Sequence, residues 1–287
     1  MNSNILDEIT RQYNTMSRSN KKLADYILST KTSAQYMSIT SMAENCGVAE
    51  ATITRFCRLL GLGGYNDFKL ALAKALGSST ANANVSMDLG VNILNDEGLD
   101  SMCKKLYIED MNALNETLEL LNEHHVTYAV NLLSQARHVY CFGQGGSNVM
   151  AMEAWARFAT ATPKFIHISD SHMQAMAASL CTEQDVILFF SYSGSTKDML
   201  DLIGPERSGR ARVILITHFP KSPASSLADV ILLCGSNESP LQSGSVAAKI
   251  GQMFIIDYLY CAFCKKNPEL VSKNLDSTTK AISQKLL

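Results

Sequence analysis

The feature that most constrains the fold is a series of five short apolar runs, rich in β-branched and aromatic residues, in the C-terminal two-thirds of the chain. They lie at 138–142, 164–168, 185–190, 212–216 and 229–233, with helical stretches between them. Uninterrupted apolar runs are typical of parallel strands that are buried on both faces of a sheet, and strands that alternate with helices indicate a doubly wound α/β fold. Ligands of such sheets bind beyond the carboxyl ends of the strands. The residues that follow each run are therefore candidate binding residues.

A turn rich in hydroxyl groups follows the third run. Ser191, Ser193, Ser195 and Thr196 surround Gly194, and a helix is expected to begin at about Thr196. The unpaired N–H groups of a helix N-terminus, its dipole and the hydroxyl donors together favour an anion. We therefore expect this turn to bind the phosphate of a small molecule. A capped helix without a ligand is the alternative interpretation, and the turn alone does not decide between them.

A second loop follows the first run and contains Gly145, Gly146 and Ser147. Its glycines let backbone N–H groups approach a ligand closely. The loop lacks the dinucleotide-binding fingerprint, because Asn148 stands where the third glycine belongs, and the chain has no P-loop for a nucleoside triphosphate. Two neutral, hydroxyl-rich loops suit a sugar that carries one phosphate, and the sequence predicts no cofactor and no metal site.

The N-terminal 77 residues have a different pattern. After an amphipathic helix expected over 18–31, Ser41 and Glu44 fit a capping box that starts a short helix, and Gly47 supplies a left-handed turn. A second helix is expected from about residue 50 to 60, ended by Gly61. Its apolar face carries Ile53, Phe56, Cys57 and Leu60, and its other face carries Thr52, Thr54, Arg55 and Arg58.

Two short helices joined by a glycine turn form the arrangement that a helix-turn-helix needs, because small hydroxyl and arginine side chains on the second helix can reach bases and phosphates in the major groove. A helical bundle with a solvated face is an equally open interpretation of the pattern alone. The net charge of −2 makes no general case for nucleic acid. Residues 1–75 hold nine Lys and Arg against six Asp and Glu, which leaves 16 against 21 for the rest. A mildly basic N-terminal domain is compatible with DNA binding.

Length and composition indicate a soluble protein of more than one domain, since 287 residues exceed the usual size of one domain. The eight cysteines are scattered among apolar neighbours, and no signal peptide is apparent, so we expect reduced thiols and a cytoplasmic location. Cys261 and Cys264 are expected to pack in the core of a long helix over 246–265. No apolar run approaches the roughly 20 residues that span a bilayer, so no membrane association is expected.

Both halves resemble known families. The N-terminal half resembles the DNA-binding domain of RpiR-type transcriptional regulators in Ala43, Gly47, Val48, Thr52, Arg55, Phe56, Leu60, Gly61 and the run Gly64–Lys69. Ala49 departs from the family pattern, which has a capping serine there. The C-terminal half resembles the sugar isomerase (SIS) phosphosugar-binding domain in Gly143, Gly145 and Ser147 and in Ser191, Ser193, Gly194 and Thr196. RpiR-type regulators join the same two domains.

This resemblance implies an all-α helix-turn-helix domain over 1–77, a linker over 78–105 and a doubly wound SIS domain over 106–287. Helices expected over 102–121 and 124–135 pack either on the sheet domain or on a second subunit. It also implies that Ser147, Ser191, Ser193, Ser195 and Thr196 hold a phosphosugar, and that Ser239–Lys249 contributes at the sugar end, across a dimer interface. The implied partners are an operator in double-stranded DNA, a second or further copy in a homodimer or homotetramer, and an effector such as the 6-phosphate of N-acetylglucosamine or N-acetylmuramic acid.

The rival function is a phosphosugar isomerase or lyase that uses the same pocket. Such chemistry needs a base, and usually a second acid or base, within reach of the sugar carbons. The candidates are Glu153, His172, Glu238 and His218, each of which also has an ordinary structural interpretation. A DNA-binding domain has no role on a plain enzyme, so the regulator is favoured.

Overall fold

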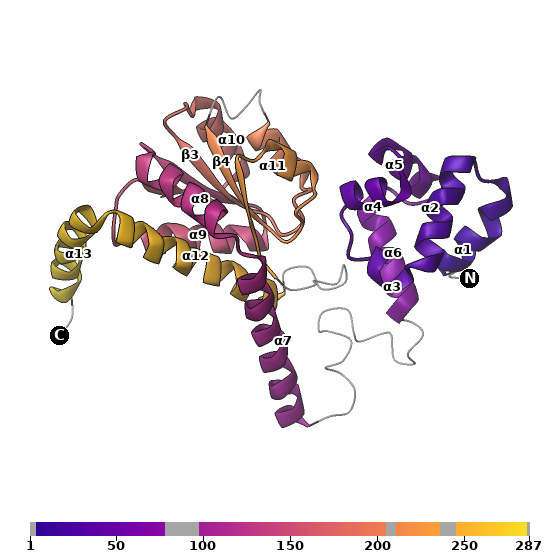
Figure 1. The fold of residues 1–287 in the computed structure, drawn as a ribbon, viewed down its shortest axis with the longest axis horizontal. Helices are drawn as coiled ribbons and strands as arrows, with labels where there is room; N and C mark the ends of the chain where they lie inside the picture. Colours follow the sequence, from indigo (N-terminus) through magenta and orange to yellow (C-terminus); the bar gives the residue numbers. More distant parts are fainter. Residues whose placement is uncertain (1–3, 78–97, 205–210, 236–244, 286–287) are drawn as a thin grey trace. The chain divides into compact units, whose positions relative to one another are not determined.

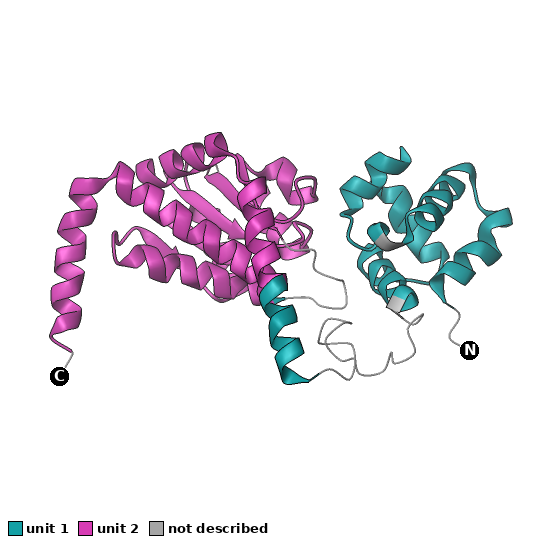
Figure 2. Cartoon of the chain, turned by 60° about the horizontal axis from the view of Figure 1, so that its bottom comes forward, with its two compact units in different colours: residues 1–108, 237–245 teal, residues 109–236, 246–287 magenta. Residues whose placement is uncertain are grey.

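The computed structural model describes residues 4–77, 98–204, 211–235 and 245–285. The chain divides into two compact units (Figure 2), one of residues 1–108 and 237–245 and the other of residues 109–236 and 246–287. Of the predicted linker, 78–105, residues 78–97 lie outside the described residues. The residues from Leu99 onward belong to a helix. The domain limits at 77 and 106 therefore stay predictions.

The first unit contains a domain of helices only. These are α1 (Ile5–Gln12), the 3-10 turn η1 (Tyr13–Thr15), α2 (Arg18–Ser29), α3 (Lys31–Ala34), α4 (Ile39–Cys46), α5 (Glu50–Leu59) and α6 (Tyr65–Gly77). They enclose one core, in which Leu23, Ile27, Ile53, Phe56 and Phe68 are almost completely buried. The apolar face predicted for the second short helix is confirmed, since all four of its residues lie in this core.

The predicted capping box is wrong. Helix α4 begins two residues before Ser41, and Ser38 is its N-cap: the Ser38 hydroxyl oxygen accepts a hydrogen bond from the Ser41 N–H at 3.0 Å. Both serines suit a cap, but a start at Ile39 adds a turn that packs on the core. The two glycine turns are as expected. Gly47 has φ +62° and Gly61 has φ +80°. Residues other than glycine rarely adopt these left-handed backbone conformations.

The second unit contains a five-stranded parallel sheet in the order β2-β1-β3-β4-β5. Figure 1 labels β3 and β4, which lie side by side in it. The strands of the sheet are β1 (Val139–Gly143), β2 (Phe165–His167), β3 (Val186–Phe190), β4 (Arg212–Thr217) and β5 (Val230–Leu233). Each coincides with one of the five predicted runs. The run before the hydroxyl-rich turn forms β3, which is completely buried, at the centre of the sheet.

Helices cover both faces of this sheet. Helices α8 (Glu123–Gln135), α9 (Gly146–Ala159) and α12 (Val246–Lys266) cover one face, and α10 (Ser171–Leu180) and α11 (Lys197–Ile203) cover the other. The unit also contains α7 (Leu99–Leu120) from Glu109 onward, α13 (Pro268–Ser283) and a 3-10 turn η2 (Pro223–Leu227). One core lies between the sheet and α8, α9 and α12, and a second core lies between the sheet and α10 and α11. This is the predicted doubly wound arrangement.

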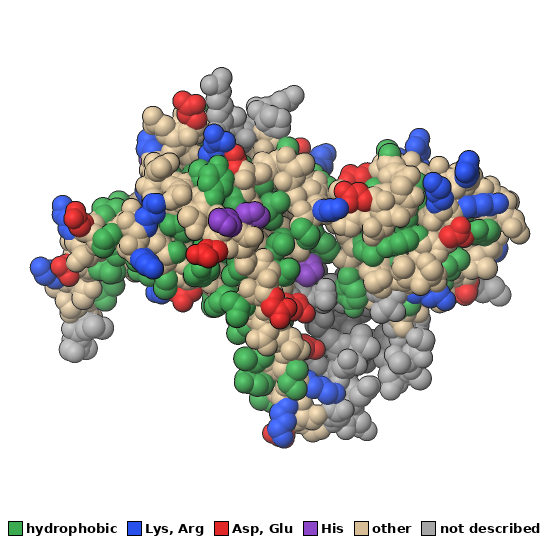
Figure 3. Space-filling view, viewed as in Figure 1, with side chains coloured by type: hydrophobic (Ala, Val, Ile, Leu, Met, Phe, Trp, Pro, Cys, Tyr) green, Lys and Arg blue, Asp and Glu red, His purple; other side chains and the backbone are tan. Residues whose placement is uncertain are grey.

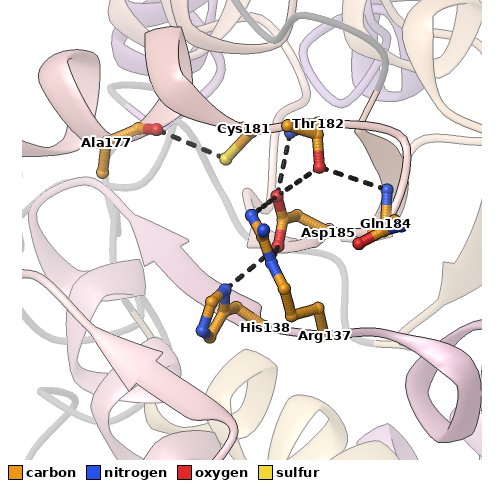
Figure 4. Close-up of polar contacts among 7 residues, drawn as sticks. All are labelled: Arg137, His138, Ala177, Cys181, Thr182, Gln184 and Asp185. Carbon is orange, nitrogen blue, oxygen red and sulfur yellow. Dashed lines mark hydrogen bonds and ion pairs between the residues drawn. The ribbon is translucent and has the colours of Figure 1, made fainter.

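A buried carboxylate fixes the amino ends of β1 and β3 (Figure 4). Asp185 is completely buried and accepts hydrogen bonds from the Arg137 guanidinium, from His138, and from the N–H and hydroxyl of Thr182, at 2.9–3.2 Å. Burial by itself raises the pKa of Asp185, but the donors on Thr182, Arg137 and His138 outweigh it, and the pKa lies below its usual value. The cluster lies at the end of the sheet opposite the predicted binding loops.

Helix α7 packs very closely against two segments, the residues just after β5 and helix α12. The Thr117 hydroxyl oxygen accepts a hydrogen bond from the Gly235 N–H at 2.9 Å. A Cβ atom on Gly235 would lie 2.8 Å from the Ala113 carbonyl oxygen, and one on Gly251 would lie 2.7 Å from the Thr117 hydroxyl. Only glycine fits at these two positions, so α7 rests on backbone rather than on side chains.

Helix α12 is long and apolar enough to cross a membrane by length and composition alone. Eight of its residues, among them Ile255, Leu259 and Phe263, are buried in the unit, so its apolar character is that of a core helix. The expectation for its two cysteines is wrong for one of them. Cys261 is exposed, whereas Cys264 is half-buried and packs against the core between the sheet and α12.

Candidate functional site

The two predicted binding loops leave neighbouring strands at the same edge of the sheet. Gly143, the last residue of β1, is paired with Phe190, the last residue of β3. The chain continues from β1 to one side of the sheet and from β3 to the other, so the loops flank the point where the strand order reverses. Doubly wound proteins with this strand order bind ligands at this crevice.

The loop after β1 requires its glycines. A Cβ atom on Gly143 would lie 2.5 Å from the Ser147 carbonyl oxygen, so only glycine lets α9 begin this close to the strand. Gly145, the residue before α9, has φ +54° and supplies no capping side chain. Gly145 and Gly146 are exposed and Ser147 is half-buried, which leaves the amino end of α9 open to an anion.

A buried glutamine, which the sequence did not single out, holds this loop in position. Gln174 of α10 is completely buried, and its amide donates to the carbonyls of Ile168 at 2.7 Å and Gly143 at 3.3 Å. Its oxygen accepts a hydrogen bond from the Gln144 side chain at 2.8 Å. The ends of β1 and β2 and the loop between β1 and α9 are thereby joined through one side chain.

The loop after β3 is closed by its own hydroxyl groups. The Ser191 oxygen accepts from the Gly194 N–H at 3.2 Å, and the Ser193 oxygen accepts from the Ser195 N–H at 3.3 Å. The Ser195 hydroxyl donates to the Ser193 carbonyl, so its proton is already engaged. The hydroxyl protons of Ser191 and Ser193 are not used in these two bonds. Thr196 is exposed and is the N-cap of α11, which confirms the predicted start of that helix.

Gly194 fixes this loop against η2. Its φ is +59°, and a Cβ atom there would lie 2.1 Å from the Ser222 hydroxyl. Its carbonyl accepts a hydrogen bond from the Ala224 N–H at 3.0 Å. Any side chain at position 194 would prevent this close contact between the loop and η2.

Lys249 adds a cation to the site. It lies in the first turn of α12, is half-buried, and its ammonium lies 3.9 Å from the position that a Cβ atom on Gly146 would take. No ion-pair partner of Lys249 is found among the described residues. Sequence reasoning included Lys249 only as the end of the segment Ser239–Lys249, of which 239–244 lie outside the described residues. Its position beside α9 depends on a contact between distant segments, which no local pattern signals.

The candidate catalytic residues do not form an acid–base pair. Glu153 lies on α9 and His172 on α10, and these helices cover opposite faces of the sheet. The His218 ring is stacked on Tyr192, and its Nδ1 lies 3.0 Å from the Cys234 carbonyl oxygen. Glu238 lies outside the described residues. Within the described ranges no group of three His, Cys, Asp or Glu side chains could hold a metal ion.

The second candidate site is formed by α4, the turn at Gly47 and α5. The Thr40 hydroxyl of α4 donates to the Glu50 carboxylate at 2.6 Å, which ties the two helices together at the start of α5. Ala49, the N-cap of α5, makes no side-chain capping bond, as expected from its departure from the family pattern. The Thr52 N–H is bonded to the Ala49 carbonyl, so the N–H groups of the first turn that a phosphate could use are those of Glu50 and Ala51.

The four predicted DNA-binding residues lie on one helix. Arg55 and Arg58 are exposed, and Thr52 and Thr54 are half-buried. The Arg55 guanidinium donates to the Thr52 hydroxyl at 3.3 Å, and the Thr54 hydroxyl is bonded to the Glu50 carbonyl. Further Lys and Arg side chains lie on the surface of this helical domain (Figure 3). The outer side of α5 thus has the small hydroxyl and arginine side chains that a recognition helix uses.

Comparisons with known proteins match both the helix-turn-helix domain and the sheet domain of this chain. The family model described as "Helix-turn-helix domain, rpiR family" matches residues 3–79, and the model described as "SIS domain" matches residues 132–262. The transcriptional regulator HexR of Escherichia coli (strain K12) is 28% identical over 281 residues, which cover 98% of this chain and 95% of HexR. RpiR of the same organism is 26% identical over 263 residues, which cover 92% of this chain and 87% of RpiR.

A solved structure is similar over the whole length. The Vibrio vulnificus NanR protein, complexed with ManNAc-6P, is 28% identical, covers 99% of both chains and has a TM-score of 0.87. The helical domain, the parallel sheet and the order in which they follow one another are therefore common to this chain and to known regulators. The chain belongs to the RpiR family of transcriptional regulators, which join a helix-turn-helix domain to a SIS domain.

Proposed function

We propose that this chain is a transcriptional regulator whose binding to an operator is controlled by a sugar phosphate held where β1 and β3 end. The observation that carries the proposal is the meeting of three anion-binding features at one point. The Gly145–Ser147 and Ser191–Thr196 loops leave adjacent strands, and the Lys249 ammonium lies beside Gly146. N–H groups, hydroxyl groups and one cation suit a phosphate ester.

The effector that we propose is an amino sugar 6-phosphate. The similarity to NanR, whose structure holds ManNAc-6P, supports this class, as does the resemblance of both loops to the phosphosugar-binding family. ManNAc-6P is therefore the first probe, beside the 6-phosphates of N-acetylglucosamine and N-acetylmuramic acid. Ser147, Ser191, Ser193, Ser195 and Thr196 remain the proposed phosphate ligands. We expect the engaged hydroxyl of Ser195 to contribute least among them.

The proposed DNA site is the outer side of α5, with Thr52, Thr54, Arg55 and Arg58 in the major groove. A homodimer, or a homotetramer of two such dimers, sets two of these helices about 34 Å apart, or a multiple of that, on a near-palindromic operator. The sugar phosphate changes operator binding only by its differential affinity for the two arrangements of the dimer. Such a regulator works on DNA in the cytoplasm, where its cysteines stay reduced.

We propose no enzymatic activity. Glu153 and His172 belong to opposite faces of the sheet, and the ring of His218 is engaged by Tyr192 and by the Cys234 carbonyl. An isomerase would need two of these groups at one sugar carbon. Incubation of the full chain with the phosphosugar panel should therefore give no turnover. Conversion of any of these sugars at a rate that depends on Glu153 or His172 would contradict this part of the proposal.

The central experiment pairs calorimetry with DNA binding. The full chain is titrated with ManNAc-6P and with ManNAc, and its affinity for an operator selected from random DNA is measured by fluorescence anisotropy with and without each sugar. Ser193→Ala should weaken ManNAc-6P binding about tenfold, in line with the loss of one hydrogen bond to a charged group, and leave DNA affinity unchanged. Arg55→Ala should have the opposite effect. Equal damage to both activities by both variants would exclude the two-domain mechanism.

A further inference from the structure

The outer side of α5 carries two arginines that differ in their position along the helix. Arg55 lies in the middle of α5, whereas Arg58 lies in its last turn, and both are exposed. Because they are three residues apart, they share one face of the helix. A recognition helix contacts base edges chiefly with its N-terminal residues, and its C-terminal end lies closer to the DNA backbone. The two arginines are therefore placed for different contacts.

Arg55 is held by a side chain of the preceding turn. Its guanidinium donates to the Thr52 hydroxyl oxygen at 3.3 Å. Side chains of an α-helix lean toward its N-terminus, so this bond holds the guanidinium over the first turn of α5. A guanidinium has five N–H donors, and the bond to Thr52 uses one of them. The remaining donors include a parallel pair, which matches the O6 and N7 acceptors of a guanine.

The first turn of α5 leaves room in front of this guanidinium. Ala51 lies one turn before Arg55 on the same face, is exposed, and carries only a methyl group. Glu50 is the one acidic residue of α5, and its carboxylate accepts a hydrogen bond from the Thr40 hydroxyl at 2.6 Å. This carboxylate is thereby engaged with α4. The outer edge of the Arg55 guanidinium is therefore open to a base.

We propose that Arg55, positioned by Thr52, recognises one guanine in each half-site of the operator, and that Arg58 binds a phosphate. The inference rests on the DNA binding of the proposed function and names the base that α5 selects. Two N–H groups of one guanidinium form parallel hydrogen bonds to guanine O6 and N7, and no other base presents two such acceptors in the major groove. A phosphate contact has no base preference, so Arg58 adds affinity for DNA of any sequence.

Thr52 acts through Arg55 in this scheme. An arginine side chain has many rotamers, and it loses conformational entropy when a base fixes one of them. The bond to Thr52 restricts the guanidinium before DNA binds and orients its plane, so less entropy is lost on binding. Thr52 is therefore a positioning residue. Its hydroxyl should affect the choice of base more than the affinity for DNA in general.

The test measures base preference and salt dependence separately on the full chain. An operator is selected from random DNA with the wild type, and each G·C pair of its half-sites is then exchanged for A·T in turn. At one position the exchange should weaken wild-type binding about 5- to 150-fold and leave the affinity of Arg55→Ala almost unchanged. Arg58→Ala is the matched control. It should lose the same factor of affinity for both operators, and its plot of log K against log salt should be less steep by about 0.9.

Two variants of Thr52 test the positioning role. Thr52→Val keeps the shape of the side chain and removes the hydroxyl, so it should lower the preference for guanine about 2- to 12-fold. Thr52→Ser should restore that preference. Full wild-type preference in Thr52→Val would overturn the role of Thr52.

The remaining outcomes separate this inference from the proposed function. A guanine preference that survives Arg55→Ala, or that Arg58→Ala removes equally, would overturn the inference and leave the sugar-controlled regulator intact. A guanine preference that depends on Arg55, in a chain whose operator affinity ManNAc-6P does not change, would contradict the regulator and keep the inference. A chain that selects no sequence from random DNA would overturn both.

Discussion

The contact of Gly194 with Ser222 allows a quantitative test of how the phosphate loop is held. In Gly194→Ala the new Cβ atom would lie 2.1 Å from the Ser222 hydroxyl oxygen and 2.7 Å from the Ser222 Cβ atom. Both distances are too short for any real contact, so the loop or η2 must move by about 1 Å. The left-handed φ of +59° at this position is also unfavourable for alanine.

The two costs can be separated. A left-handed alanine costs roughly 1 kcal/mol, and overpacking of a tight contact costs about 1–3 kcal/mol, so Gly194→Ala should lower the free energy of unfolding by about 2–4 kcal/mol. In a Ser222→Gly background the collision disappears and only the backbone cost remains. The same Gly194→Ala change should then cost only about 1 kcal/mol. The coupling between positions 194 and 222 is therefore expected to be about 1–3 kcal/mol.

Urea unfolding of the four proteins, followed by circular dichroism, measures this coupling. Calorimetry with ManNAc-6P on the folded proteins should show at least a tenfold loss of affinity for Gly194→Ala, because displacement of the loop misaligns Ser191 and Ser193. Operator affinity without sugar should not change. Equal costs of Gly194→Ala in both backgrounds would refute the collision as the cause, and unchanged sugar affinity in a destabilised variant would refute the link between this loop and the ligand.

Three further outcomes are expected. Asp185→Asn should destabilise the SIS domain by about 2 kcal/mol at pH 7, because it removes a buried carboxylate that accepts hydrogen bonds from Arg137 and His138. Since the folded pKa of Asp185 is lowered, this difference should be complete above about pH 4 and shrink as the pH falls below it, which unfolding at pH 3 and pH 6 measures. Burial lowers the pKa of Lys164 to about 8, so between pH 8 and about 10 the unfolded chain keeps a proton that the folded chain has lost. The free energy of unfolding of the wild type should therefore rise relative to that of Lys164→Met as the pH increases across this range. Thermal melting of both proteins at about pH 7.5 and about pH 9.5 tests this. Ser38→Ala should cost the helix-turn-helix domain about 1 kcal/mol in melting experiments, and Ser41→Ala clearly less, because only the Ser38 hydroxyl caps α4.

The strands were predictable because their signal is local. The strands β1, β3 and β4 are runs of residues buried on both faces or nearly so, and such a run can be recognised without knowledge of its neighbours. The edge strands β2 and β5 are only partly buried, but their apolar residues are still consecutive in the sequence. The glycine turns at Gly47 and Gly61 were predictable for the same reason, since each ends an amphipathic helix. The start of α4 was not, because Ser38 and Ser41 both suit an N-cap and the choice depends on how the first turn packs.

The supporting contacts of the candidate site were not predictable. Gln174 joins the ends of β1 and β2, and Lys249 lies beside Gly146 although the two residues are far apart in the sequence. A glutamine in a helix and a lysine at the start of another carry no pattern that separates them from ordinary surface residues. Their roles follow from contacts between residues far apart in the sequence, whereas each of the serine and glycine loops consists of consecutive residues and can be recognised from them.

The crossing of α7 over Gly235 and Gly251 has a mechanical consequence. Where side chains separate two elements, a small movement of one is absorbed by rotamer changes in the other. Here the Thr117 hydroxyl accepts a hydrogen bond from the Gly235 N–H and also contacts the backbone of α12 at Gly251, so no side chain of β5 or α12 separates the elements at these points. We therefore expect a displacement of α12, which carries Lys249, to move α7 at Thr117 as well. Helix α7 begins at Leu99, and the chain before Leu99 leads back to the DNA-binding domain, so this contact is the point at which a change at the site would first reach that part of the chain.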